Sequence, residues 1–152
     1  IALHIRRGDF QDFQSKALAE ETLRNIEKLA PLDYPMYIAT DENDPDFRNN
    51  FRSHRRTFFW EDLLAKFPNL EIPAAYVGPI EQILCACAFR FIGTDLSTFS
   101  TYVARLRGYI AAPDTASYFH TEYYEKPKPQ PTANDLPGRT YLRESPRFWL
   151  EC

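Results

Sequence analysis

The feature that most constrains this chain is the way in which two of its apolar runs end. The run at residues 1–5 is followed by the basic sequence Arg6-Arg7-Gly8, and the run at residues 89–92 is followed by Gly93-Thr94 and a hydroxyl-rich stretch at 97–101. A guanidinium presents a planar fork of N–H donors that suits phosphate oxygens. A helix that begins at hydroxyl residues presents free backbone N–H groups at the positive end of its dipole. If the two ends meet in space, they would hold a diphosphate from both sides.

The order of elements predicts an α/β fold. Apolar runs of strand length at residues 1–6, 36–39, 56–60 and 89–92 alternate with helical patterns at 18–30, 61–66, 78–88 and 99–108. In the helix at 78–88, proline falls in the first turn, where its missing N–H costs nothing. Alternation of this kind indicates a parallel sheet covered by helices on both faces. The apolar stripes expected to face the core are Ala19, Leu23, Ile26 and Ala30 in the first helix, Ile80, Ile83, Leu84, Cys87 and Ala88 in the third, and Phe99, Tyr102, Val103 and Leu106 in the fourth.

Four residues whose side chains could bind a polar ligand fall at strand ends. His4, Arg6, Asp41 and Thr94 each lie at or just past the carboxyl end of a predicted strand. In parallel sheets, ligands bind beyond the carboxyl ends of the strands. The sequence therefore predicts that these four residues converge on one edge of the sheet.

The residues on the first strand allow two interpretations each. Because Arg6 and Arg7 are adjacent, they point to opposite faces of a strand. One arginine can then reach a ligand while the other makes a structural ion pair, for which Asp9 is a possible partner. His4 shares the face of Arg6, and it is either a ligand contact or a hydrogen-bonded core residue.

The remaining polar candidates also have ordinary structural roles. Asp41 is placed to cap the helix that follows it, and Glu81 falls in the first turn of the predicted helix, where the dipole favours any carboxylate. Ser97 and Thr98 are ordinary cap residues. Their interpretation as an anion site depends on their position after a strand and on the arginines opposite.

Composition excludes several classes of function. The 152 residues are the size of one domain, and the net charge of −3 argues against a nucleic-acid binder. The only dense basic run, at residues 52–56, is expected to be a solvated loop. No apolar run approaches the roughly 20 residues of a membrane helix. Cys85, Cys87 and Cys152 suggest no disulfide framework, the first two being expected as small buried hydrophobes, and no His/Cys spacing suggests zinc.

Composition changes near residue 125. We expect one folded domain at residues 1–125 and a proline-rich, extended tail at residues 126–152. The chain opens inside an apparent strand, so we expect it to be a fragment whose upstream part is missing.

Three stretches taken together resemble a known family. They are residues 4–9 (HIRRGD), residues 37–42 (YIATDE), and residues 81–108, which contain FIGT, STF and RLRG in that order. The chain resembles the GDP-fucose protein O-fucosyltransferases and their relatives, the α1,6-fucosyltransferases. The resemblance covers residues 1–108 and implies the C-terminal, Rossmann-like, GDP-fucose-binding domain of a GT-B glycosyltransferase.

The resemblance also implies roles for individual residues. Arg6 matches the essential arginine that contacts the β-phosphate and supports the departure of GDP. His4 matches a nucleotide-contacting histidine, and Glu81 matches an acidic residue, usually aspartate, that binds guanine. The diphosphate would be held by Ser97, Thr98 and Phe99. Positions required in the α1,6 relatives are matched by Arg7, Asp9 and Asp41, which the resemblance therefore implies also bind GDP-fucose.

The family implies the wider function as well. It implies transfer of fucose from GDP-fucose to a serine or threonine of a protein, with no metal or other cofactor, in the lumen of the endoplasmic reticulum or Golgi. The alternatives are α1,6 transfer to a glycan and a non-catalytic domain that binds a nucleotide or glycan. In the family, the acceptor is bound largely by an N-terminal domain that this chain lacks, so we expect the chain alone to transfer little.

Overall fold

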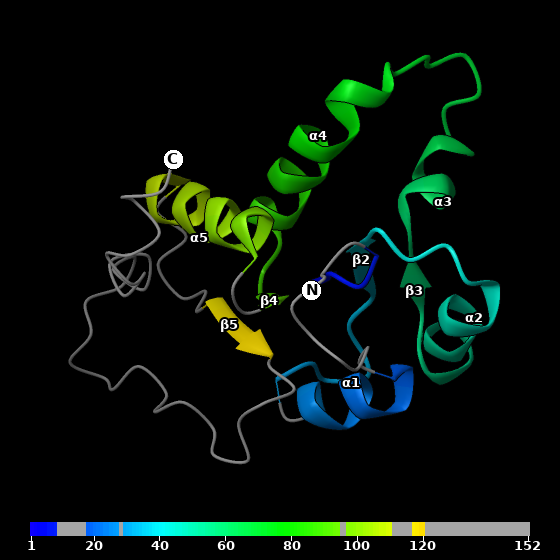
Figure 1. The fold of residues 1–152 in the computed structure, drawn as a ribbon, viewed down its shortest axis with the longest axis vertical. Coiled ribbons are helices and arrows are strands. Elements are labelled where there is room, and N and C mark those ends of the chain that lie inside the picture. The colour runs from blue at the N-terminus through cyan, green and yellow to red at the C-terminus, as the bar shows by residue number, and fades with distance from the viewer. Residues whose placement is uncertain (9–17, 28, 95–96, 111–116, 121–152) are drawn as a thin grey trace.

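The computed structural model describes residues 1–8, 18–27, 29–94, 97–110 and 117–120. These residues form a sheet of five parallel strands in the order β3-β2-β1-β4-β5, flanked by helices (Figure 1). The predicted α/β, Rossmann-like fold class is confirmed. Asp9 and the predicted tail at 126–152 lie outside the described residues. The elements are β1 (Ala2–Ile5), α1 (Ala19–Ile26), β2 (Met36–Thr40), α2 (Pro45–His54), β3 (Thr57–Phe58), α3 (Trp60–Leu64), α4 (Ala74–Cys87), β4 (Phe91–Thr94), α5 (Thr98–Ile110) and β5 (Ser117–His120).

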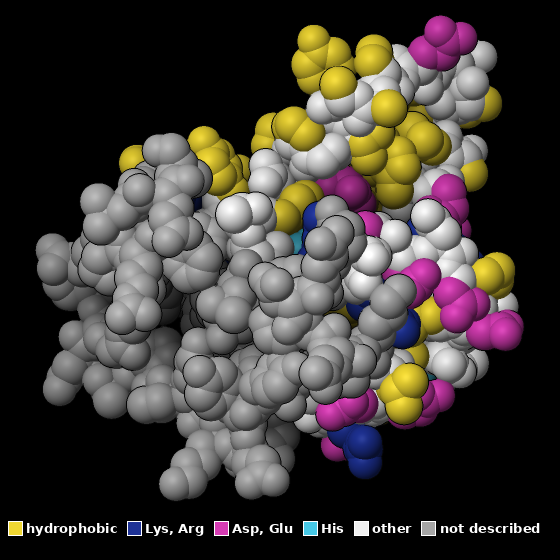
Figure 2. Space-filling model, viewed as in Figure 1, with side chains coloured by type: hydrophobic (Ala, Val, Ile, Leu, Met, Phe, Trp, Pro, Cys, Tyr) yellow, Lys and Arg dark blue, Asp and Glu magenta, His cyan; other side chains and the backbone are white. Residues whose placement is uncertain are grey.

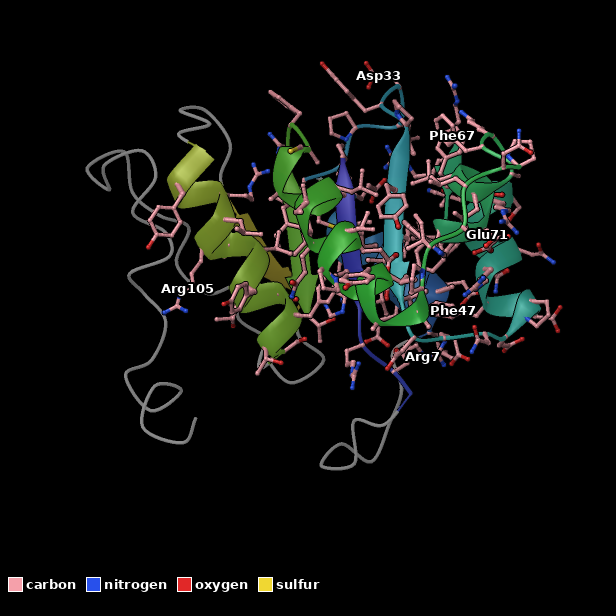
Figure 3. All side chains as sticks on the ribbon, turned by 90° about the horizontal axis from the view of Figure 1, so that it is seen from above. Arg7, Asp33, Phe47, Phe67, Glu71 and Arg105 are labelled. Carbon is pink, nitrogen blue, oxygen red and sulfur yellow. The ribbon has the colours of Figure 1, made fainter. Side chains whose placement is uncertain are left out.

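The side chains of β1 divide between two hydrophobic layers. Leu3 and Ile5 pack with residues of α1 and α2, whereas Ala2 packs with residues of α4 and α5. This alternation follows from the two-residue period of a strand. Helices α4 and α5 therefore cover one face of the sheet, and α1 and α2 cover the other (Figure 3).

The sheet has a topological switch point between β1 and β4. These strands are neighbours, yet the helix after β1 lies on one face and the helix after β4 lies on the other. The connections therefore leave the carboxyl edge in opposite directions. In sheets of this kind, ligands bind beyond the carboxyl ends of the strands at such a switch point.

The helix predicted at 78–88 differs from the observed α4. The helix begins at Ala74, so Pro79 lies inside it rather than in its first turn. The predicted core stripe is also wrong, because Ile83 is 55% exposed and Leu84 is 39% exposed. Small residues, Cys85 and Ala86, make the contact with the sheet instead. The apolar outer side of α4 forms part of the hydrophobic surface in the upper part of Figure 2.

The predictions about the other helix stripes and about the cysteines have mixed outcomes. The stripe of the first helix is confirmed, since all four of its residues are buried. In α5, Val103 is buried but Tyr102 is exposed. Cys85 is buried as expected, whereas Cys87 is exposed. None of the described helices is long and apolar enough to cross a membrane.

The basic run at 52–56 is not a solvated loop. It begins inside α2, a helix that the sequence analysis missed together with β5. Arg55 is buried, and its guanidinium donates to three carbonyl oxygens of the segment between α1 and β2. The acceptors are Ala30 O (2.7 Å), Pro31 O (2.6 Å) and Tyr34 O (2.5 Å). Arg55 therefore fixes the connection that leads into β2.

Replacement of Arg55 tests this structural role. We expect Arg55→Leu to lower the free energy of unfolding by about 3 kcal/mol, because buried carbonyls lose a charged donor. The matched control is Arg56→Leu, since the exposed Arg56 only lies over the Phe58 ring, and its loss should stay below about 1 kcal/mol. Urea unfolding measures both values. Equal losses for the two variants would contradict this role of Arg55.

Candidate functional site

His4 joins the end of β1 to the first turns of α5. Its ring stacks on Phe99 with 4.2 Å between centroids and 16° between planes. Its Nδ1 lies 2.7 Å from the Ser100 hydroxyl. This close approach requires glycine at position 93, because a Cβ there would lie 2.6 Å from Ser100 Oγ. His4 is thus a buried, hydrogen-bonded residue that holds the two parts of the site together.

Thr94, the last residue of β4, makes a second link to the end of β1. Its hydroxyl donates to His4 O at 2.9 Å and accepts from the Arg6 backbone N–H at 3.0 Å. The threonine side chain thus links β4 to β1 at the carboxyl edge of the sheet, beyond the last paired residues of the two strands. Arg6 is held beside β4 as a result.

The two arginines differ in their surroundings, and each one pairs with a different carboxylate. Arg7 turns toward α2, where its guanidinium lies 4.0 Å from the centre of the Phe47 ring and its Nε is 3.6 Å from a Glu42 carboxylate oxygen. Its side chain is only 11% exposed, so Arg7 anchors the segment after β1 to Glu42 and to Phe47 of α2. The Arg6 side chain is 35% exposed, and its Nε lies 3.2 Å from Asp41 Oδ2. Arg6 is therefore the more accessible arginine for a ligand.

Asp41 does not cap the helix that follows it. Asp44 has that role, accepting from Asp46 N at 3.0 Å. Asp41, just beyond β2, instead accepts from the backbone N–H groups of Arg7 at 2.8 Å and Gly8 at 2.9 Å. It therefore supports the turn that leaves β1.

Helix α5 supplies the other side of the site. It begins at Thr98, and the Ser97 carbonyl accepts the first helical bond, from Thr101 N at 3.0 Å. The N–H groups of a first helical turn have no partner within the helix. Ser97 is buried and Thr98 is exposed. With Phe99 stacked on His4, this first turn lies against the carboxyl end of β1.

Glu81 lies apart from this group. It is the eighth residue of α4 rather than a first-turn residue, because the helix begins at Ala74. Its Oε1 accepts a 2.5 Å hydrogen bond from the hydroxyl of Tyr37, in the amino-terminal half of β2. Burial is the main cause that raises the pKa of Glu81, and burial together with the nearby carboxylate raises the pKa of Tyr37.

The structure brings most of the predicted residues to one edge. His4, Arg6, Asp41 and Thr94 are linked by the contacts above, and α5 begins beside them. The sequence analysis missed Ser100, Glu42 and Phe47; the spacing of Phe47 and Phe51 at i, i+4 was the available signal for α2. Among the described residues, no group of three or more His, Cys, Asp and Glu side chains is arranged to hold a metal ion. Arginine, hydroxyl and backbone N–H donors at one edge are suited to phosphate oxygens.

The Glu81–Tyr37 pair gives a pH-dependent prediction. A carboxyl whose pKa is raised in the folded state adds stability below its unfolded pKa, and this stability is lost as pH rises through the folded pKa. The stability of the unmodified chain relative to Glu81→Gln should therefore fall as pH rises from about 4, the ordinary range of a glutamate, toward neutrality. Urea unfolding of both proteins across this range measures the difference. A difference that is constant, or that grows with pH, would contradict the buried environment of Glu81.

The chain was compared with known proteins. No protein-family model matches it, and the search of the curated proteins found no match. The parallel α/β fold and the residues that meet at its carboxyl edge are therefore the observations on which an assignment of function depends.

Proposed function

We propose that the carboxyl edge of this sheet binds the diphosphate of GDP-fucose and that the chain is the donor-binding half of a fucosyltransferase. The observation that carries the proposal is the junction of β1 with α5. His4 contacts Phe99 and Ser100, and the Arg6 backbone is bonded to Thr94. The partly exposed Arg6 guanidinium pairs with Asp41 just beyond β2, and the first turn of α5 packs on His4, so both sets of donors belong to the carboxyl edge beside this switch point. The resemblance in three stretches supports fucose and guanine as the groups attached to the diphosphate.

Arg6 has the catalytic role in this proposal. Breaking the bond between fucose and GDP leaves new negative charge on a β-phosphate oxygen. A guanidinium already in place and the N–H groups of the first turn of α5 would stabilise that charge more in the transition state than in the ground state. The proposed acceptor is a serine or threonine of a protein, bound with help from another domain, and the proposed compartment is the endoplasmic reticulum or Golgi lumen. Transfer to a glycan, as in the α1,6 relatives, is the alternative reaction.

Calorimetry with four nucleotides tests the binding claim. GDP and GDP-fucose should bind the chain more tightly than UDP, which lacks the guanine, and more tightly than GMP, which lacks the β-phosphate. Equal binding of all four, or binding of none, would contradict the proposal. Detection of fucose transfer by the chain alone would contradict only the expected need for another domain.

Replacement of Arg6 tests the residue directly. Arg6→Ala should weaken GDP binding by about tenfold to a hundredfold, because a charged donor to phosphate contributes roughly 1.5–3 kcal/mol. In a transfer-competent form of the protein, it should lower the rate by about a hundredfold or more. The control is Arg24→Ala, since Arg24 is exposed on α1. If both variants bind GDP as the unmodified chain does, Arg6 has no role in binding.

A further inference from the structure

The carboxylate of Asp41 makes contacts with three consecutive residues. Oδ1 accepts from Arg7 N at 2.8 Å, and Oδ2 accepts from Gly8 N at 2.9 Å. Oδ2 also lies 3.2 Å from Nε of Arg6. All three partners belong to the turn that leaves β1, whereas Asp41 directly follows β2. The Asp41 side chain therefore fixes both the backbone of this turn and the orientation of the Arg6 guanidinium.

The contact at Nε has a consequence for Arg6. Nε is the guanidinium nitrogen nearest the backbone, so an ion pair there restrains the plane in which the Nη groups lie. An arginine side chain carries roughly 2 kcal/mol of rotamer entropy, and a group restrained before binding loses less of it when the ligand arrives. The partner carboxylate is only 25% exposed, which limits its own movement.

We infer that Asp41 is a positioning residue: it holds Arg6 and the turn after β1 in the geometry that binds the diphosphate, without contacting the ligand itself. This inference rests on the proposed function. It assigns Asp41 a role different from the direct substrate contact expected from the sequence.

The same contacts also fit a competing role for Asp41, which makes the opposite prediction. A carboxylate bound to an arginine and two backbone N–H groups could occupy the place of a phosphate and compete with it. The packing around Gly8 favours positioning. A Cβ at Gly8 would lie 2.9 Å from Asp41 Oδ2 and 3.1 Å from Cγ, so the turn is closed tightly on the carboxylate. Displacement of Asp41 would also remove the acceptor that the Arg7 and Gly8 N–H groups share.

Calorimetric titration of GDP into Asp41→Asn separates the two roles. Asparagine keeps one acceptor oxygen but removes the charge that restrains Arg6. Positioning predicts that the dissociation constant for GDP rises by about tenfold, whereas competition predicts that it falls. The matched control is Asp44→Asn, which removes one negative charge nearby and keeps an equally good helix cap. This control should bind GDP within about twofold of the unmodified chain. Tighter binding by Asp41→Asn, or an equal effect of the control, would overturn the inference.

A double-mutant cycle tests whether Asp41 acts through Arg6. In the Arg6→Ala background, Asp41→Asn should change the GDP dissociation constant by no more than about twofold, because the residue that it positions is gone. The same tenfold loss in both backgrounds would overturn the inference. If Arg6→Ala alone leaves GDP binding unchanged, the proposed function fails instead, so the two failures are distinguishable.

A second variant guards against a folding defect in Asp41→Asn. Gly8→Ala keeps the aspartate at position 41 but adds a methyl group that forces its carboxylate to shift. We expect it to weaken GDP binding in the Arg6 background and to have little effect in the Arg6→Ala background. Thermal melting of each variant checks that the chain is folded. Unchanged GDP binding by a folded Gly8→Ala would contradict the tight closure on which the inference depends.

Discussion

The contact between His4 and the first turns of α5 is the interaction on which the rest of the site depends. It exists because position 93 is glycine, which lets Ser100 approach β4 closely enough to reach the histidine ring. Phe99 completes the contact by stacking on the His4 ring. Two segments far apart in the sequence, each with donors for an anion, are brought to the same point.

The charges beside this junction are balanced in pairs. Arg6 pairs with Asp41, and Arg7 pairs with Glu42. The first pair joins the turn after β1 to the residue that follows β2, and the Arg7 guanidinium of the second pair also lies over the Phe47 ring of α2. An anion that enters this region meets donors of fixed orientation rather than a broad positive surface. Such an arrangement suits recognition of a small diphosphate better than attraction of an extended polyanion.

Sequence patterns predicted the sheet better than they predicted the helices. Apolar runs revealed four parallel strands, and polar residues at their ends revealed the edge where His4, Arg6 and Asp41 meet. Periodicity failed in α4, because the sheet is contacted through its small residues while Ile83 remains exposed. The role of Asp41 was also beyond reach of the sequence: a capping position and a partner of Arg7 N and Gly8 N look alike until β1 and β2 are paired.

The most direct test of the account is a GDP titration of the isotope-labelled chain, followed by amide NMR. If the junction binds a diphosphate, the signals of Gly8, in the turn after β1, and of Phe99 and Ser100, in α5, should shift together and saturate at the same GDP concentration. Shifts confined to other parts of the chain, with these signals unmoved at saturation, would contradict the central claim.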